Sequence, residues 1–253
     1  MNNETPSPDS RLLTGRTVLV TGASRGIGRA TVLAAHREGA YVVAHWASNK
    51  QAALDLQHLL GDRGCLVRAD LRDASRTEGM WQEALAWRGR VDVLVNNAGA
   101  WLASPLEDPE QWRQGWADNL ALNLTGPADL SRNAVLHFRE RGGGVVVSVS
   151  SRSAHRGDDA EHLAYGAAKA GLLALTKGIA RGFAADGVLA YSVAPGWVAT
   201  DLADAGEADG ASVPLGEITP PQDVAEMFVF LASGRSRHTT GATIDITGAD
   251  YVR

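Results

Sequence analysis

The chain has 253 residues, 45% of them hydrophobic, which is enough for one domain with a substantial core. Lys and Arg number 24 against 29 Asp and Glu, so the formal net charge is -5, and no basic run indicates a nucleic-acid or membrane partner. The single cysteine, Cys65, excludes an internal disulfide and favours a reducing compartment. We therefore expect a cytoplasmic protein, without a metal site, whose partner is a small molecule.

The N-terminal stretch MNNETPSPDS lacks the features of a secretion signal, and its Pro, Ser and Asn content favours disorder. Residues 1–14 are predicted to form a disordered tail, and residues 15–253 a single domain. Within that domain the segment 199–219 is rich in Gly and Ala, holds five carboxylates and contains no Lys or Arg. This segment is predicted to be a mobile flap beside the substrate.

Short apolar segments alternate with segments of helical length and pattern along the whole domain. Near-continuous apolar strands separated by helices are typical of a parallel sheet that is covered on both faces. The sequence therefore predicts a doubly wound α/β Rossmann fold with a seven-stranded parallel sheet, which binds ligands at the carboxyl ends of its strands. The predicted strands are 17–21, 41–45, 65–69, 91–95, 144–149, 189–194 and 242–247.

The first strand is followed directly by TGASRGIGRA, in which Gly22, Gly26 and Gly28 lead into a helix. Glycines allow a tight turn and a close backbone approach to a pyrophosphate, and the start of a helix attracts its negative charge. Because the glycines lie between a strand and a helix, they predict a dinucleotide site.

The end of the second strand indicates which nicotinamide cofactor binds. Dinucleotide folds commonly place an acid there to hold the adenosine ribose, and that acid repels an extra phosphate. This chain has no acid in the range 45–49, whereas Arg25 and Lys50 could pair with a phosphate. We expect NADP(H) as the preferred cofactor and NAD(H) as the second option. The alternative is that Arg25 is an ordinary solvated loop residue.

Two features of the predicted helices indicate a catalytic role for their residues. Tyr165 and Lys169 are one helical turn apart, so both could act on one bound group, and an adjacent ammonium lowers the pKa of a phenol. The alternative is a pair with both side-chain tips in solvent.

Asn123 lies inside a long helix predicted over 108–140. Pro127 has no N–H to offer the Asn123 carbonyl, which is therefore free to hold a water. The alternative is a simple kink.

Two of the seven tryptophans lie where a substrate could touch them, Trp101 shortly after NNAG and Trp197 within PGWVAT. They could wall an apolar or aromatic pocket, or they could pack against the cofactor loop or another subunit. Ser153 is placed in the same substrate pocket. The acidic stretch GDDAEH, 157–162, is expected to be a solvated loop.

Six short motifs follow one another in the order found in the short-chain dehydrogenase/reductase family, which the chain resembles from about Gly15 to its C-terminus. They are TGASRGIG at 21–28, ADLRD at 69–73, NNAG at 96–99, the serine pair 150–151, YGAAK at 165–169 and PGWVAT at 195–200. The cofactor-binding residues that these motifs and the end of the second strand imply are Gly22, Ser24, Arg25, Gly26, Ile27, Gly28, His45, Ser48, Asn49, Asp70, Leu71, Asn97, Ala98, Gly99, Tyr165, Lys169, Pro195, Gly196, Val198 and Thr200.

The resemblance also implies a catalytic set. Tyr165 would exchange a proton with the substrate oxygen, Lys169 would assist it, and Ser151 rather than Ser150 would polarise that oxygen. Asn123 would hold a water that links Lys169 to solvent. Packing of the long helix against its copy implies a homotetramer or homodimer.

These features predict an NADP(H)-dependent oxidoreductase that transfers a hydride between nicotinamide and a carbonyl or secondary alcohol. One alternative is a 3-oxoacyl thioester reductase acting on acyl carrier protein or CoA substrates, for which Arg152, Arg156 and Arg181 could be docking residues. An enoyl reductase is disfavoured, since such relatives have a wider Tyr–Lys spacing. An alternative of another class is a catalytically silent NADP(H)-binding sensor or scaffold.

Overall fold

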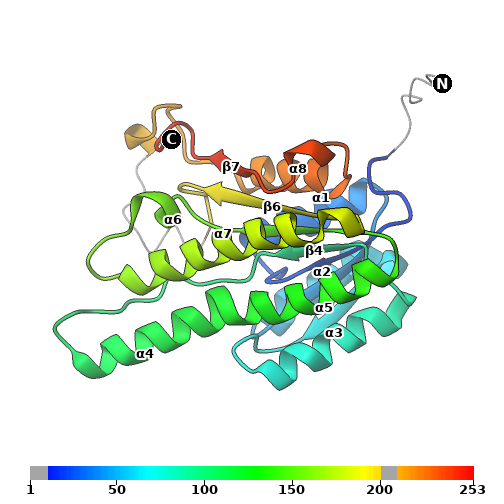
Figure 1. The fold of residues 1–253 in the computed structure, drawn as a ribbon, viewed down its shortest axis with the longest axis horizontal. Coiled ribbons are helices and arrows are strands. Elements are labelled where there is room, and N and C mark those ends of the chain that lie inside the picture. The colour runs from blue at the N-terminus through cyan, green and yellow to red at the C-terminus, as the bar shows by residue number, and fades with distance from the viewer. Residues whose placement is uncertain (1–10, 201–209) are drawn as a thin grey trace.

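The computed structural model describes residues 11–200 and 210–253. Its strands form one sheet in the order β3-β2-β1-β4-β5-β6-β7, and every neighbouring pair is parallel (Figure 1). The predicted Rossmann fold with seven parallel strands is confirmed. The strands are β1 Thr17–Val20, β2 Tyr41–Trp46, β3 Gly64–Arg68, β4 Val93–Asn96, β5 Gly144–Val149, β6 Val188–Pro195 and β7 Thr243–Ile246.

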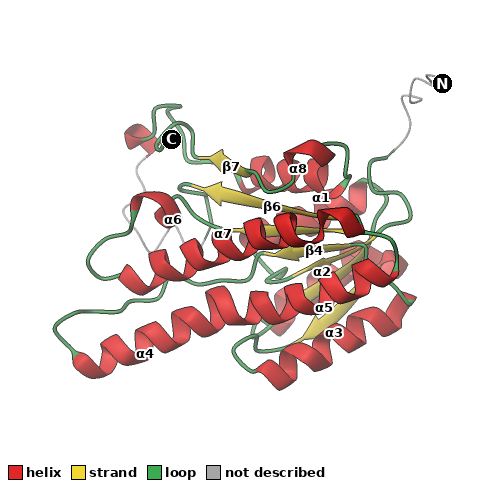
Figure 2. Cartoon of the chain, in the orientation of Figure 1, coloured by secondary structure: helices red, strands yellow, loops and turns green. Residues whose placement is uncertain are grey.

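Helices cover both faces of the sheet (Figures 1 and 2). One core lies between the sheet and α1, α2 and α8, and the other lies between the sheet and α3, α5 and α7. None of these helices, among the residues described, is both long and apolar enough to cross a bilayer. The helices are α1 Gly26–Arg37, α2 Lys50–Leu60, α3 Ala74–Arg88, α4 Pro109–Leu120, α5 Gly126–Glu140, α6 Ser153–Arg156, α7 Leu163–Phe183 and α8 Pro221–Ala232, with short 3₁₀ turns at Gly61–Arg63, Ala184–Asp186, Gly210–Ser212 and Arg237–Thr239.

The alternation of side chains along each strand builds both cores at once. In β1, Val18 and Val20 belong to the core under α1 and α8, whereas Leu19 between them belongs to the core under α3 and α5. All three are buried. A strand that is apolar at every position therefore fits here, because neither face of the sheet meets water.

The start of the domain differs from its predicted boundary. Leu13, placed in the disordered tail by the sequence, is fully buried, and its N–H donates to the carbonyl of Glu38 at 3.0 Å. The ordered chain therefore includes residues 11–14, because Leu13 completes the core beside α1. Residues 1–10 and residues 201–209 of the expected flap lie outside the described part of the chain.

The long helix expected over 108–140 is divided. The Asp108 side chain caps α4 by accepting the N–H groups of Glu110 and Gln111. Between α4 and α5 lies one π-helical turn, Ala121–Thr125, in which the N–H of Gly126 donates to the carbonyl of Ala121. Pro127 follows at once and lacks the N–H that a regular helix would need there, so the wider turn is the local solution.

Candidate active site

The carboxyl ends of the strands open into a cavity of about 710 Å³. The cavity brings together most of the residues predicted for the cofactor, the catalytic set and the substrate pocket. Only two predicted residues do not line it, Asn49 and Asn123. The predicted residues that do line it are Gly22, Ser24, Arg25, Gly26, Ile27, Gly28, His45, Ser48, Asp70, Leu71, Asn97, Ala98, Gly99, Trp101, Ser151, Ser153, Tyr165, Lys169, Pro195, Gly196, Trp197, Val198 and Thr200.

The glycine loop is too crowded for side chains. Gly22 has a φ of +66° and Gly26 a φ of +51°, which only glycine adopts readily. A Cβ on Gly28 would lie 2.2 Å from the carbonyl oxygen of Gly22. The loop therefore brings bare backbone to the start of α1, and such a cradle fits a pyrophosphate.

Asn97, after β4, ties its loop to the glycine loop. Its Nδ2 donates to the carbonyl of Thr21 at 2.8 Å, and its own N–H donates to the Thr21 hydroxyl at 2.9 Å. The N–H of Ala98 donates to the same hydroxyl at 2.9 Å. Asn97 lines the cavity, and its amide nitrogen holds the two loops at a fixed separation, while its predicted bond to the cofactor stays a prediction.

His45, at the end of β2, is 2% exposed and uses both ring nitrogens within the protein. Nδ1 accepts the N–H of Gly22 at 3.1 Å, and Nε2 donates to the carbonyl of Ala69 at 3.1 Å. Burial lowers the pKa of His45 to about 4, so the ring is neutral at physiological pH. His45 lines the cavity as predicted, but its ring nitrogens are committed to the backbone of two loops.

Asn49 corrects the predicted cofactor set. Its Oδ1 accepts the N–H of Ala52 at 3.0 Å and caps the start of α2, a common role for asparagine. The side chain therefore serves the helix, and neighbouring Ser48 is the residue that faces the cavity.

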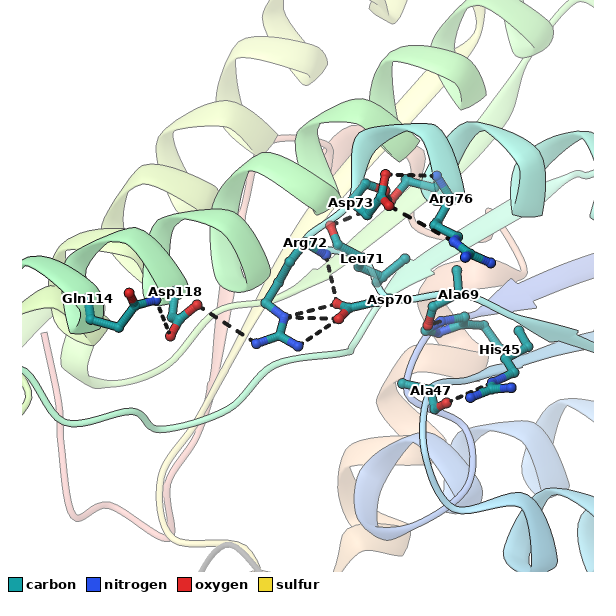
Figure 3. Close-up of polar contacts among 12 residues, drawn as sticks. His45, Ala47, Ala69, Asp70, Leu71, Arg72, Asp73, Arg76, Gln114 and Asp118 are labelled. Carbon is teal, nitrogen blue, oxygen red and sulfur yellow. Dashed lines mark hydrogen bonds and ion pairs between the residues drawn. The ribbon is translucent and has the colours of Figure 1, made fainter.

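Asp70 lies at the rim of the cavity in an ionic network (Figure 3). Arg72 binds its carboxylate through two nitrogens, at 2.6 Å from Nη2 and 3.0 Å from Nε. The same guanidinium lies 3.8 Å from Asp118 of α4, and the hydrogen bonds from Arg72 hold the pKa of Asp70 below its usual range. Asp70 is therefore an oriented anion at this rim.

Two adjacent serines after β5 face different partners. The Ser150 hydroxyl donates to the carbonyl of Lys169 at 3.1 Å, which fastens α7 to the strand. The Ser151 hydroxyl accepts the N–H of Ser153 at 3.1 Å and lies close enough to Tyr165 to lower the pKa of the phenol. Ser151, the serine predicted from the sequence, is the one beside the phenol.

Burial sets the charges of the Tyr–Lys pair. It raises the pKa of Tyr165 to about 12, against a smaller lowering by the Ser151 hydroxyl, and it lowers the pKa of Lys169 to about 8. Lys169 Nζ lies 5.8 Å from the centre of the Tyr165 ring and donates to the carbonyl of Val149 at 2.8 Å. Desolvation of the phenolate outweighs the lowering predicted from Lys169, so the net shift of the Tyr165 pKa is opposite to the predicted one.

Asn123 reaches the catalytic group from behind the cavity wall. Its Oδ1 accepts the N–H of Ala100 at 3.2 Å, and its Nδ2 donates to the Ala100 carbonyl at 3.0 Å. A Cβ on Gly99 would lie 2.6 Å from Asn123 Oδ1 and 3.1 Å from Lys169 Nζ. The glycine is thus the space across which Asn123 and Lys169 approach each other.

Two tryptophans line the cavity, and their packing partners could not be predicted from the sequence. Trp101 and Trp197 meet at 90°, with ring centres 6.4 Å apart. The His162 ring stacks on Trp101 with centres 3.6 Å apart, although its segment was expected to be a solvated loop. The loop 157–162 is therefore only partly solvated, because the His162 side chain is just 14% exposed.

Arg152 is buried beside Trp197. It is 6% exposed, its guanidinium lies 4.9 Å from the centre of the Trp197 ring, and it forms an ion pair with Asp250. Burial lowers the pKa of Arg152 to about 10, which leaves it charged at neutral pH. Its assignment as a surface docking residue is therefore wrong. The pairing with Asp250 leaves no local signal in the sequence, since nearly a hundred residues separate the two.

No group of three or more His, Cys, Asp and Glu side chains suited to a metal ion occurs in residues 11–200 or 210–253. The described cavity brings together a phenol, a hydroxyl, an ammonium and a glycine-rich loop.

The chain is similar in sequence to known proteins. The profile of a family described as enoyl-(acyl carrier protein) reductase matches residues 22–248. The 3-oxoacyl-[acyl-carrier-protein] reductase FabG of Staphylococcus aureus is 32% identical over 245 residues, which cover 94% of this chain and 98% of the relative. An uncharacterized short-chain type dehydrogenase/reductase of Sinorhizobium fredii is 35% identical over 251 residues, with 94% and 98% covered.

A solved structure has the same fold as this chain. A dehydrogenase/reductase from Sinorhizobium meliloti superposes with a TM-score of 0.85 at 31% identity, over 96% of this chain and 98% of that one. The chain belongs to the short-chain dehydrogenase/reductase family and is an oxidoreductase acting on CH–OH and C=O groups.

Proposed function

We propose that the protein is an NADP(H)-dependent reductase of ketones, able to oxidise the corresponding secondary alcohols. The observation that carries the proposal is the convergence of Tyr165, Ser151 and Lys169 in one cavity with the glycine loop. Retention of the complete group also argues against a silent sensor or scaffold, which has no need of it.

The residues divide the work as follows. The nicotinamide supplies or accepts the hydride. The Ser151 hydroxyl donates a hydrogen bond to the substrate oxygen, and the Tyr165 phenol delivers the proton to it. A pKa of about 12 keeps the phenol protonated at neutral pH, which suits reduction of a carbonyl. The Lys169 ammonium stabilises the phenolate left behind, and Asn123, close to Lys169, holds the water through which the proton is replaced.

The nucleotide half supports NADP(H). Residues 45–49, at and after the end of β2, include no acid that would repel an extra phosphate, and Arg25 and Ser48 line the cavity. An arginine can pair with a phosphate through two nitrogens. Arg25 is therefore proposed to bind the phosphate that distinguishes NADP(H) from NAD(H).

Kinetics with a panel of ketones test this proposal. We expect oxidation of NADPH at least tenfold more efficient than of NADH, and we expect Arg25→Ala to raise KM for NADPH about tenfold while leaving KM for NADH unchanged. Arg29→Ala, on α1 directly after the loop that carries Arg25 but outside the cavity wall, is the matched control. A kcat/KM for NADH comparable with that for NADPH in the wild-type protein would contradict the proposed cofactor.

The names of the relatives favour a second candidate, reduction of 3-oxoacyl thioesters. Arg152 is buried, so carrier docking would have to use exposed residues such as Arg156 and Arg181. A 3-oxoacyl thioester given with NADPH separates the candidates. If its kcat/KM exceeds that of every free ketone by a hundredfold or more, the acyl substrate is the physiological one.

Assembly and location are also part of the proposal. The family resemblance supports a homodimer or homotetramer, and the single cysteine supports the cytoplasm. Light scattering on the purified protein decides between one, two and four copies.

A further inference from the structure

We infer that Trp101 and Trp197 form an aromatic corner that selects ketones carrying a flat ring next to the reacting carbonyl. The inference rests on the proposed function and names the substrate class of the same site. Both indoles are half-buried, both line the cavity, and their planes are perpendicular.

Trp101 is fixed to the tyrosine side of the site. Its indole stacks on His162, and the carbonyl of His162 accepts the N–H of Tyr165 at 3.1 Å. The two segments are joined again where the N–H of Ser104 donates to the carbonyl of Glu161 at 2.6 Å. A displacement of Trp101 therefore displaces the start of the helix that carries the phenol.

Trp197 is fixed to the serine side of the site. Arg152 directly follows Ser151 and places its guanidinium over the indole. Its backbone N–H donates to the carbonyl of Pro195 at 3.1 Å. Asp250 pairs with the same guanidinium and restricts its movement. Arg152 is thus a positioning residue for Trp197, because its charge lies against the ring and its backbone lies against the same loop.

The corner geometry favours a ring over a flexible chain. His162 occupies one face of Trp101 and Arg152 lies against Trp197, so the remaining indole surface that lines the cavity is already oriented. A planar ring can stack on one indole and present its edge to the other, and such aromatic contacts add stabilisation beyond the area they bury. An aliphatic group fills the same volume but gains only the area.

A matched pair of ketones tests the inference. Acetophenone and cyclohexyl methyl ketone are both methyl ketones with the same number of heavy atoms. They differ in the planarity of the ring and in its conjugation with the carbonyl, and the intrinsic difference in reactivity cancels when their ratio is compared between variants. We expect Trp101→Leu and Trp197→Leu each to lower the kcat/KM ratio of acetophenone to cyclohexyl methyl ketone about fivefold to tenfold. Trp112→Leu, on α4 and outside the cavity wall, is the control and should leave that ratio unchanged.

Binding separates recognition from chemistry. Calorimetry on Tyr165→Phe loaded with NADPH measures the affinity for each ketone without turnover, and we expect acetophenone to bind about tenfold more tightly, with most of that preference lost in either tryptophan variant. Retained affinity for NADPH shows that each variant is folded.

The outcomes are distinguishable. Equal losses for both ketones, or equal affinities, overturn the inference and make the corner a general apolar wall suited to an acyl chain. Absence of turnover with either ketone in the wild-type protein contradicts the proposed function, while the calorimetric preference still decides the inference.

Discussion

Around the glycine loop, side chains bind backbone: His45 bridges Gly22 and Ala69, and Asn97 holds Thr21. At the substrate half, side chains bind other side chains, as in the stack of Trp101 on His162 and the pair of Arg152 with Asp250. The bonds around the glycine loop hold it in place, which suits a cofactor site. The contacts of Trp101 and Arg152 join side chains to one another, so single substitutions there change the cavity surface while the bonds of the glycine loop remain.

The largest expected effect is at the substrate half. Asp250→Ala leaves the buried guanidinium of Arg152 without its partner, and we expect a loss of about 2–4 kcal/mol in the free energy of unfolding. Affinity for NADPH should stay within about twofold, because the ion pair lies away from the glycine loop. Asp245→Ala, which breaks a more exposed pair with Arg253, is the control and should cost much less. Denaturant unfolding and NADPH titration measure both quantities.

His45→Leu should affect both stability and the nucleotide. The substitution leaves the Gly22 N–H and the Ala69 carbonyl without partners, which costs about 2–3 kcal/mol, and it loosens the glycine loop. We expect NADPH to bind about tenfold more weakly. A variant with unchanged stability and unchanged NADPH affinity would show that the bridge is dispensable.

The low pKa of His45 also predicts a pH dependence of stability. Between its unfolded value of 6.5 and about 4, the unfolded chain takes up a proton that the folded protein refuses. The unfolding free energy should therefore fall as pH decreases through this window, by about 3 kcal/mol for this group. The His45→Leu variant should lack that component, and unfolding curves measured from pH 7 to pH 4 compare the two proteins.

Lys169→Met tests the junction of the two halves. Burial lowers the pKa of Lys169 to about 8, so below that pH the folded protein carries a poorly solvated ammonium. Removing it should raise the unfolding free energy at pH 7 by about 1–2 kcal/mol, allowing for loss of the bond to the Val149 carbonyl. Turnover should fall at least a hundredfold. A variant that is both less stable and still active would contradict the role of the ammonium.

The smallest effect is expected at the nucleotide rim. Arg72→Ala frees the Asp70 carboxylate, but the network is half-exposed and its loss should change stability by less than about 0.5 kcal/mol. If Asp70 binds the adenine, its lost orientation should raise KM for NADPH twofold to fivefold. Arg76→Ala, which touches only Asp73 in this network, should leave that KM unchanged (Figure 3).

The two halves also differ in how far the sequence predicts them. The glycine loop and the Tyr165–Lys169 pair are local patterns, and together with the neighbouring motifs they predict residues that line the cavity. Asn49 was misassigned because a helix cap and a cavity residue look alike in sequence, and only the bond to Ala52 separates them. The stack on Trp101 and the partner of Arg152 come from segments distant in the chain, and no local pattern records such a pairing.

Transfer of hydride under control of Tyr165 is tested most directly by isotope transfer. NADPH deuterated at its transferable position is incubated with a ketone, and the alcohol is examined by mass spectrometry for deuterium on the carbinol carbon. We expect deuterium in the product of the wild-type protein and a rate at least a thousandfold lower with Tyr165→Phe when both proteins are saturated with NADPH. Deuterated alcohol formed at the same rate by Tyr165→Phe would contradict the assignment of Tyr165 as the proton donor.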